Sequence, residues 1–167
     1  MHPYRLVLAA LLACAAFFAG CSSPSYTYRY VPGKTATLVG GYAAAPEKAP
    51  ERVKIAIAAA NGIVGSPYVY GGGHGRGGAG FDCSGTASHV LIAAGLLDSP
   101  TPSRGFRSYG RSGSGEWISV YARKGHVFLV IAGLRLDTGY NGEGEGPRWS
   151  TRSRPAKGAV IRHPVGV

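Results

Sequence analysis

The segment HVFLVIAGLRLDT, residues 126–138, constrains the fold of this 167-residue chain more than any other stretch. HVFLVI is a run of branched and aromatic residues that predicts a buried strand, and LRLDT predicts the strand that returns beside it. If Ala132 and Gly133 form a two-residue turn, Ile131 lies opposite Leu134. A four-residue turn keeps the same pairing, whereas a three-residue turn moves the side chains of the second strand to the other face.

This pairing brings two polar side chains together at the open end of the hairpin. Phe128 then lies opposite Asp137 and His126 opposite Gly139, so His126 and Asp137 are diagonal neighbours on one face, with backbones roughly 7 to 8 Å apart. A polar residue at the first position of an apolar strand, such as His126, is unusual. The carboxylate of Asp137 on the neighbouring strand can orient its imidazole and stabilise the charged form. We therefore interpret His126 as a candidate base and Asp137 as its orienting group.

A second constraint is GGAGFDCSG, residues 77–85, where a cysteine follows a glycine-rich loop and Asp82. From Cys83 onward, CSGTASHVLIAAGLL has apolar and small residues at helical spacing and predicts a helix that stops near Gly95. Cys83 would begin this helix, where unpaired backbone N–H groups and the helix dipole favour a thiolate. A cysteine used only for packing is expected inside the apolar face, so the position favours a nucleophile.

The other two cysteines lie in the N-terminal segment MHPYRLVLAALLACAAFFAGC. Arg5, an apolar run and small residues before Cys21 indicate an export signal that is too short for a typical membrane span. FAGC, residues 18–21, resembles the lipobox of bacterial lipoproteins, which implies cleavage before Cys21 and lipid on its sulfur. Cys14 is the weaker lipidation candidate, and a signal without lipid is the alternative. Cys83 is then an unpaired thiol in an oxidising compartment, which favours catalysis.

Composition predicts three parts: a signal over 1–20, a flexible linker over 21–50 and one folded domain over 51–167. The linker is rich in Pro, Gly, Ala, Ser and Tyr without sustained periodicity. Its alternating tyrosines in YTYRYV, residues 26–31, leave open the alternative that this piece docks on the domain as a short strand. ERVKIAIAAANGIVG, residues 51–65, has an acidic start and apolar residues at helical spacing, so it predicts the first helix.

Three further histidines follow the predicted signal. His89 lies within the predicted Cys83 helix and is expected to be a packing residue. His163, in IRHP, is the main alternative to Asp137 as third member of the site, but it lacks the neighbouring-strand geometry. His74 lies in the glycine loop, where it is expected to line a cleft.

PYVYGG (residues 67–72), FDCSG (81–85) and GHVFLVI followed by LDT resemble, in this order, the motifs of the NlpC/P60 cysteine peptidases of bacterial cell walls. The resemblance covers residues 51 to about 140. It implies a papain-like α+β fold in which the Cys83 helix packs on an antiparallel sheet. It also implies that Cys83 is the nucleophile and His126 the base, with Asp137 in a third position that is often His in the family.

The same resemblance implies further contacts with substrate. The hydroxyl of Tyr68 would help to hold the substrate carbonyl or its oxyanion, together with the backbone N–H of Cys83. Asp82, Ser84 and His74 are the other residues expected to contact substrate. No metal is expected, because Glu143 and Glu145 in the loop GYNGEGEGPRW have no His or Cys ligand nearby, and no cofactor is expected either.

Substrate and location are also implied by the resemblance: peptidoglycan stem peptides, often cut between D-glutamate and diaminopimelate, by a lipoprotein of the cell envelope. Ser22 and Ser23 after the lipidated Cys21 predict the outer membrane, facing the periplasm. The formal net charge is +10, and loss of Arg5 with the signal leaves 17 Lys and Arg against 8 Asp and Glu, or about +9. Such charge favours an anionic wall or membrane surface, and export argues against nucleic acid as the partner.

Several alternatives stay open from sequence. Trp117, Trp149 and Arg148 are candidates for the cleft wall, with core or surface roles equally compatible. A wall-binding lipoprotein without activity, or a thiol amidase or acyltransferase acting on another substrate, would share many of the same features. A metallohydrolase is disfavoured because HExxH is absent, and GRSGS, residues 110–114, does not match the serine-hydrolase elbow.

Overall fold

The computed structural model describes residues 24–75, 79–139 and 145–167. Within these ranges, six strands form an antiparallel sheet in the order β4-β10-β5-β6-β7-β8. The strands are β4 (Arg111–Ser112), β5 (Ile118–Arg123), β6 (His126–Ile131), β7 (Leu134–Asp137), β8 (Arg148–Ser150) and β10 (Val160–His163). The predicted α+β class is confirmed.

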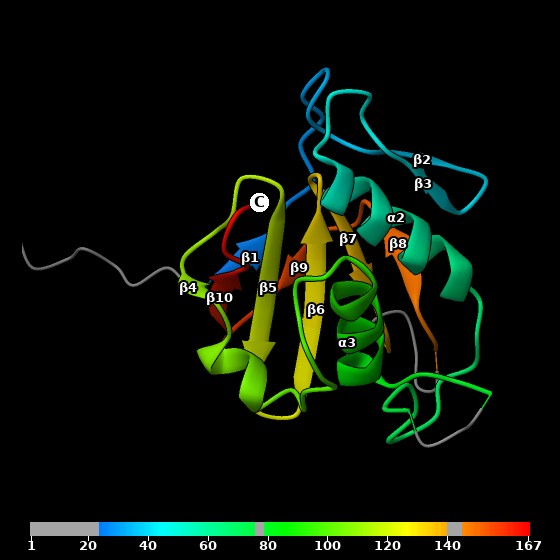
Figure 1. The fold of residues 1–167 in the computed structure, drawn as a ribbon, viewed down its shortest axis with the longest axis vertical. Helices are drawn as coiled ribbons and strands as arrows, with labels where there is room; N and C mark the ends of the chain where they lie inside the picture. Colours follow the sequence, from blue (N-terminus) through cyan, green and yellow to red (C-terminus); the bar gives the residue numbers. More distant parts are fainter. Residues whose placement is uncertain (1–23, 76–78, 140–144) are drawn as a thin grey trace, which may run out of the picture.

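Two helices, α2 (Glu51–Ile63) and α3 (Cys83–Ala93), cover one face of this sheet, and a 3-10 helix, η1 (Gly105–Ser108), lies beside β5 and β10 (Figure 1). The first helix is thus confirmed. It buries one stripe at helical spacing, made of Val53, Ala56, Ile57, Ala60 and Ile63. None of the helices in the described ranges is long and apolar enough to cross a membrane.

The β6–β7 hairpin has the predicted register. Ile131 pairs with Leu134 across a two-residue turn, and both turn residues have positive φ, 46° at Ala132 and 75° at Gly133. A turn with two positive φ values matches the right-handed twist of the flanking strands. Successive side chains of β7 point to opposite faces of the sheet, as in any strand.

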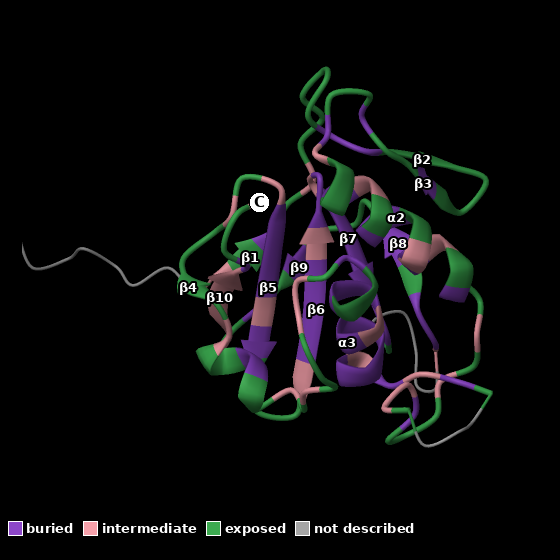
Figure 2. Cartoon of the chain, in the orientation of Figure 1, coloured by how far each residue is buried: buried purple, intermediate pink, exposed green. Residues whose placement is uncertain are grey.

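The two faces of the sheet carry separate apolar clusters, and the central strands are buried on both sides (Figure 2). On the helix side, Leu129 and Leu136 pack with Val90 and Leu91 of α3 in the main core. The smaller cluster on the opposite side is built from Tyr26, Phe128 and Ala156.

The expectation of a flexible linker over 21–50 is wrong for its described part, residues 24–50. β1 (Ser25–Tyr26) pairs with β9 (Arg154–Pro155), and β2 (Thr37–Val39) forms a hairpin with β3 (Tyr42–Ala44). Figure 1 shows β1 and β9 behind the sheet, on the side away from α3. The docking alternative for the tyrosine segment therefore holds for Tyr26, which is 3% exposed.

Small side chains explain why this segment packs so closely. Ala36, Ala43 and Ala49 are buried in the main core, and the Ala36 N–H donates to the carbonyl of Ala132 in the hairpin turn (2.8 Å). The side chain of Asn61 in α2 bonds both backbone groups of Ala43, at 3.0 and 2.9 Å. The strands are only two or three residues long, so no periodicity marks them in the sequence.

Candidate active site

Cys83 occupies the first position of α3, as predicted. Asp82 precedes it in an extended conformation and caps the helix, since its Oδ1 accepts a hydrogen bond from the Gly85 N–H (2.7 Å). The thiol is partly exposed. It therefore lies at the positive end of the helix dipole with access to solvent, where a substrate can reach the sulfur.

The glycine loop fits tightly against this helix start. A Cβ on Gly85 would lie 1.9 Å from the carbonyl oxygen of Gly72, so only glycine allows the two backbones to approach this closely. Oδ2 of Asp82 also accepts a hydrogen bond from the Gly71 N–H (2.9 Å). The loop is thus held in place by backbone contact and by the helix cap.

One hydrogen-bonded cluster joins the glycine loop to the start of α3, and it consists of His74, Asp82 and Ser84. Ser84 Oγ donates to Asp82 Oδ1 (2.9 Å), and Nε2 of His74 lies 3.3 Å from the same oxygen and 3.2 Å from Ser84 Oγ. Asp82 and Ser84 are buried, whereas the His74 side chain is 21% exposed. These contacts give Asp82 and Ser84 a role in fixing the loop, and substrate contact by this cluster stays a prediction.

The charge of Asp82 is stabilised by its hydrogen bonds. Burial is the largest influence on the pKa of Asp82 and raises it. Hydrogen bonds from Gly85, Ser84 and Gly71, together with the charge of His74, outweigh burial and hold the pKa below its ordinary value. The ionised cap is therefore the stable form near neutral pH.

His126 and Asp137 come together as the hairpin register predicts. His126 begins β6, Asp137 ends β7, and Nε2 of the imidazole lies 2.9 Å from Oδ1 of the carboxylate. Since Asp137 occupies Nε2, Nδ1 is the nitrogen left for Cys83. His126 also hydrogen-bonds to Cys83, so three groups from α3, β6 and β7 meet at one end of the sheet.

The environment of His126 favours its charged form. Burial is the largest influence on the pKa of His126 and lowers it, but hydrogen bonding to Asp137 and to Cys83, and the charges of both partners, raise the pKa above its ordinary value overall. An imidazolium beside a thiol stabilises the thiolate. The raised pKa of His126 therefore favours an imidazolium next to the Cys83 sulfur.

Two arginines that the sequence analysis did not single out contact the same carboxylate. Oδ2 of Asp137 meets Nη1 of Arg135 and Nη1 of Arg154, while Oδ1 also accepts the Thr138 N–H (2.8 Å). Arg135 precedes Asp137 by two residues, and period-two alternation could have placed both on one face. Arg154 lies in the short strand β9, for which the sequence carries no signal.

Tyr68 lies near the thiol, as its expected role requires. It forms an isolated parallel bridge with Phe81, two residues before Cys83. Burial is the main cause that raises the pKa of Tyr68, and the charges of Cys83 and Asp82 raise it further. Tyr68 is therefore a neutral phenol near neutral pH, with a proton that it can donate.

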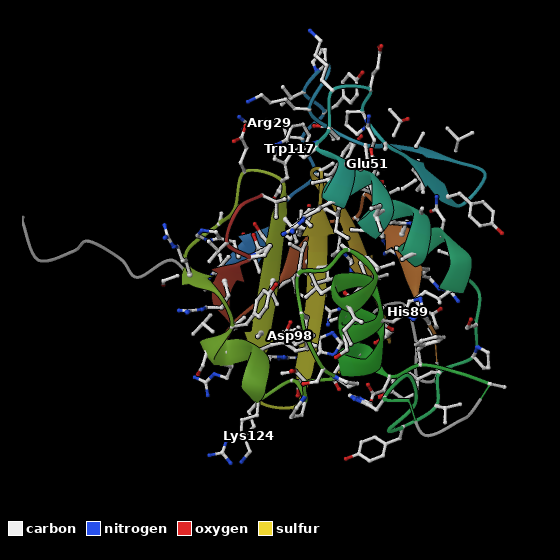
Figure 3. The ribbon with its side chains drawn as sticks, in the orientation of Figure 1. Arg29, Glu51, His89, Asp98, Trp117 and Lys124 are labelled. Atoms are coloured by element: carbon white, nitrogen blue, oxygen red, sulfur yellow. The ribbon has the colours of Figure 1, made fainter. Side chains whose placement is uncertain are left out.

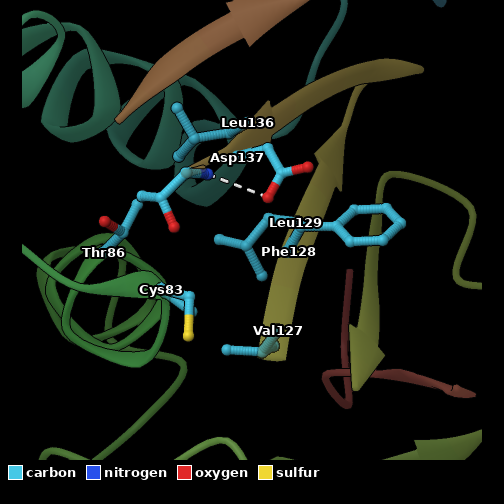
Figure 4. Close-up of a pocket in the computed structure, with 9 residues that line it drawn as sticks. Cys83, Thr86, Val127, Phe128, Leu129, Leu136 and Asp137 are labelled. Atoms are coloured by element: carbon cyan, nitrogen blue, oxygen red, sulfur yellow. Dashed lines mark hydrogen bonds between the residues drawn. The ribbon is translucent and has the colours of Figure 1, made fainter. Parts of the chain in front are cut away.

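The side of Cys83 that faces the sheet is tightly packed (Figure 4). Val127, Leu129 and Leu136 pack around the first turn of α3, and the gap between them has no room for a water molecule. A reacting carbonyl must therefore approach the sulfur from its exposed side.

The remaining histidines lie away from the thiol–imidazole pair. His89 lies on α3 and packs edge to face on Phe81, 5.3 Å between ring centroids, and burial lowers its pKa (Figure 3). This agrees with its expected packing role. His163 is in β10, which β5 separates from β6, and its Nδ1 contacts the carbonyl of Gly113 (3.0 Å). The geometry therefore favours Asp137 over His163 as the partner of His126.

The cleft-wall candidates are only partly supported. Trp149 is a core residue whose Nε1 donates to Asn61 (2.8 Å). Trp117 precedes β5, at the opposite end of the sheet from Lys124 and the start of β6 (Figure 3). Neither tryptophan can line a cleft at Cys83. Arg148 in β8 is the backbone register partner of Asp137 in β7. Its side chain is exposed, with Nη1 3.7 Å from Oε1 of Glu145, so it stays a candidate for the cleft wall.

Some sequence predictions concern other parts of the chain. The signal over 1–20 with Cys14, lipidation at Cys21 and the loop residue Glu143 lie outside the described residues. Among residues 24–75, 79–139 and 145–167, no three His, Cys, Asp or Glu side chains gather as metal ligands would.

Comparison with known proteins adds no further assignment. A scan against protein-family models and a search of curated proteins each found no match to this chain.

Proposed function

We propose that this protein is a cysteine hydrolase in which Cys83 is the nucleophile, His126 the acid and base, and Asp137 the group that orients His126. The observation that carries the proposal is the 2.9 Å contact between Asp137 and Nε2 of His126, at the sheet end where Cys83 begins α3. A helix-borne thiol opposite a strand-borne histidine is also the papain-like arrangement that the NlpC/P60 resemblance implies. A protein that only binds has no need of this alignment.

The proposed reaction is acyl transfer to sulfur followed by hydrolysis. The Cys83 thiolate attacks an amide carbonyl, and the new oxyanion is held by the Cys83 backbone N–H and the Tyr68 hydroxyl. His126 then gives its Nδ1 proton to the leaving amine as the C–N bond breaks. Water, deprotonated by His126, attacks the thioester and releases a carboxylic acid, which restores the thiolate–imidazolium pair.

The proposed substrate is a peptidoglycan stem peptide, with the bond between D-glutamate and diaminopimelate as the first choice. The support is the motif resemblance, the predicted export with lipidation at Cys21 in the outer membrane, and a charge near +9 that suits an anionic polymer. Residues 22–167 carry Cys83 as their single cysteine, so thiol chemistry in the exported chain belongs to that residue.

The test is digestion of purified peptidoglycan by residues 22–167, with mass spectrometry of released fragments. Wild type should release peptides whose masses identify the bond, and Cys83→Ala should release none. Asp137→Asn should retain binding with roughly 10²- to 10⁴-fold slower release. Equal binding by wild type and Cys83→Ala with no release from either would replace the hydrolase by a wall-binding protein.

A further inference from the structure

We propose that Arg135 and Arg154 are a pair of positioning residues that hold Asp137 for His126 and offset part of its negative charge, with strand β1 closing over them. The inference rests on the proposed function, because it assigns a role within the same site. Neither arginine is expected to touch substrate. Their guanidinium groups lie against Tyr26 and Phe128 of the smaller apolar cluster, and β9, which carries Arg154, runs behind the sheet on the side away from α3 (Figure 1).

The two oxygens of Asp137 have separate sets of partners. Oδ1 receives Nε2 of His126 and the Thr138 N–H, whereas Oδ2 receives one guanidinium nitrogen each from Arg135 and Arg154. The two arginines therefore hold the carboxylate through Oδ2, and Oδ1 is directed at the imidazole. Charge-assisted contacts of this kind set orientation more firmly than neutral hydrogen bonds.

Each guanidinium is itself held by an aromatic ring. Arg135 is fully buried and lies 5.8 Å from the centroid of the Tyr26 ring, and Arg154 lies 5.2 Å from that of Phe128. Planar guanidinium groups stack well on aromatic faces and are favoured in buried ion pairs. The rings restrict where the two cations can move.

Tyr26 connects this pair to the N-terminal segment. It pairs with Arg154 across the β1–β9 ribbon, its ring covers Arg135, and its hydroxyl donates to the carbonyl of Gly133 in the hairpin turn (2.9 Å). Burial raises the pKa of Tyr26 to about 12, so the hydroxyl keeps its proton. The segment before α2 is therefore part of the support of the site.

The charge balance gives the pair a chemical consequence. A buried carboxylate next to an imidazole strongly favours the imidazolium, and two nearby cations reduce that preference. His126 must release its proton to the leaving amine and recover one from water, which requires a pKa near the working pH. Among the described residues, Cys83 on α3 also acts on the charge of His126, and the exposed Arg123 lies opposite His126 on β5.

The test uses residues 22–167 as wild type, Arg154→Gln, Arg154→Lys and, as a matched surface control, Arg107→Gln on η1. Folding is first checked by circular dichroism. The rate of Cys83 alkylation by iodoacetamide is then measured from pH 4 to 10, and its upper transition reports loss of the imidazolium proton. This readout needs no substrate, and kcat/KM on peptidoglycan is measured in parallel.

Arg154→Gln should raise the upper transition by about one pH unit, because a cation near the imidazolium is lost, and should lower kcat/KM by up to roughly 10²-fold. Arg154→Lys, which keeps the charge, and Arg107→Gln should follow the wild-type profile. If Arg154→Gln does not fold, Arg135→Gln is expected to shift the transition in the same direction.

An unchanged or lowered transition in a folded Gln variant would overturn the inference. A shifted transition without cleavage of peptidoglycan by wild type would uphold the inference for the thiol–imidazole pair and reject the proposed substrate. A wild-type profile that lacks the upper transition would overturn both proposals.

Discussion

Replacing Tyr26 by Ala should destabilise the protein strongly, although Tyr26 lies in a segment with linker-like composition. The side chain is 3% exposed, and its hydroxyl bonds Gly133. Truncating a buried aromatic residue costs about 3 to 5 kcal/mol, and loss of the hydroxyl bond alone costs about 1 kcal/mol. We therefore expect the free energy of unfolding to fall by about 4 kcal/mol in Tyr26→Ala and by about 1 kcal/mol in Tyr26→Phe.

The assay is urea unfolding of residues 22–167 followed by circular dichroism. With an m-value of about 2 kcal/mol per molar urea, the midpoint should fall by about 2 M in Tyr26→Ala. Tyr30→Ala is the matched control, because Tyr30 lies in the same segment and is 54% exposed. Its free energy of unfolding should change by less than about 0.5 kcal/mol. Equal effects of the two alanine variants would show that the segment does not pack as described.

Two further predictions concern the support of the thiol. Gly85→Ala should lower the free energy of unfolding by about 1 to 3 kcal/mol, because its Cβ would collide with the Gly72 carbonyl. Gly62→Ala in α2, with nothing within 4 Å of the new Cβ, should instead be neutral or stabilising by urea unfolding. Asp82→Asn tests the lowered pKa of Asp82: its stabilisation is fully present above the ordinary value of 3.8 and is lost as pH falls through the folded value. The stability gap between wild type and Asp82→Asn, measured by urea unfolding at a series of pH values, should therefore shrink below about pH 4, and a gap that stays constant to pH 2 would contradict the assignment.

The elements that the sequence predicted well are those with a strong local signal. The apolar run HVFLVI and a two-residue turn predicted the pairing of Ile131 with Leu134, and this pairing placed His126 beside Asp137. The helix start at Cys83 followed from the end of the glycine loop and the helical spacing after Asp82, whereas the capping role of Asp82 came from the structure. Each of these depends on contacts between residues that are close in sequence.

The parts that the sequence did not predict depend on distant contacts. β1 and β9 are two residues long and more than a hundred residues apart, so neither carries periodicity. Arg154 gains its role only because that ribbon places it against Asp137. The tryptophans were equally ambiguous, since an aromatic residue in sequence suits a core as well as a cleft, and Trp149 proved to be core.

The most direct test of the central claim is capture of the acyl group on Cys83. Residues 22–167 are mixed with soluble stem peptide and quenched in acid after short times, and the intact mass and the Cys83-containing peptide are then measured. We expect a transient mass increase equal to the acyl portion of the peptide, located on Cys83 in wild type and absent in Cys83→Ala. Cleavage that proceeds without this adduct, or that persists in Cys83→Ala, would contradict nucleophilic catalysis by the thiol.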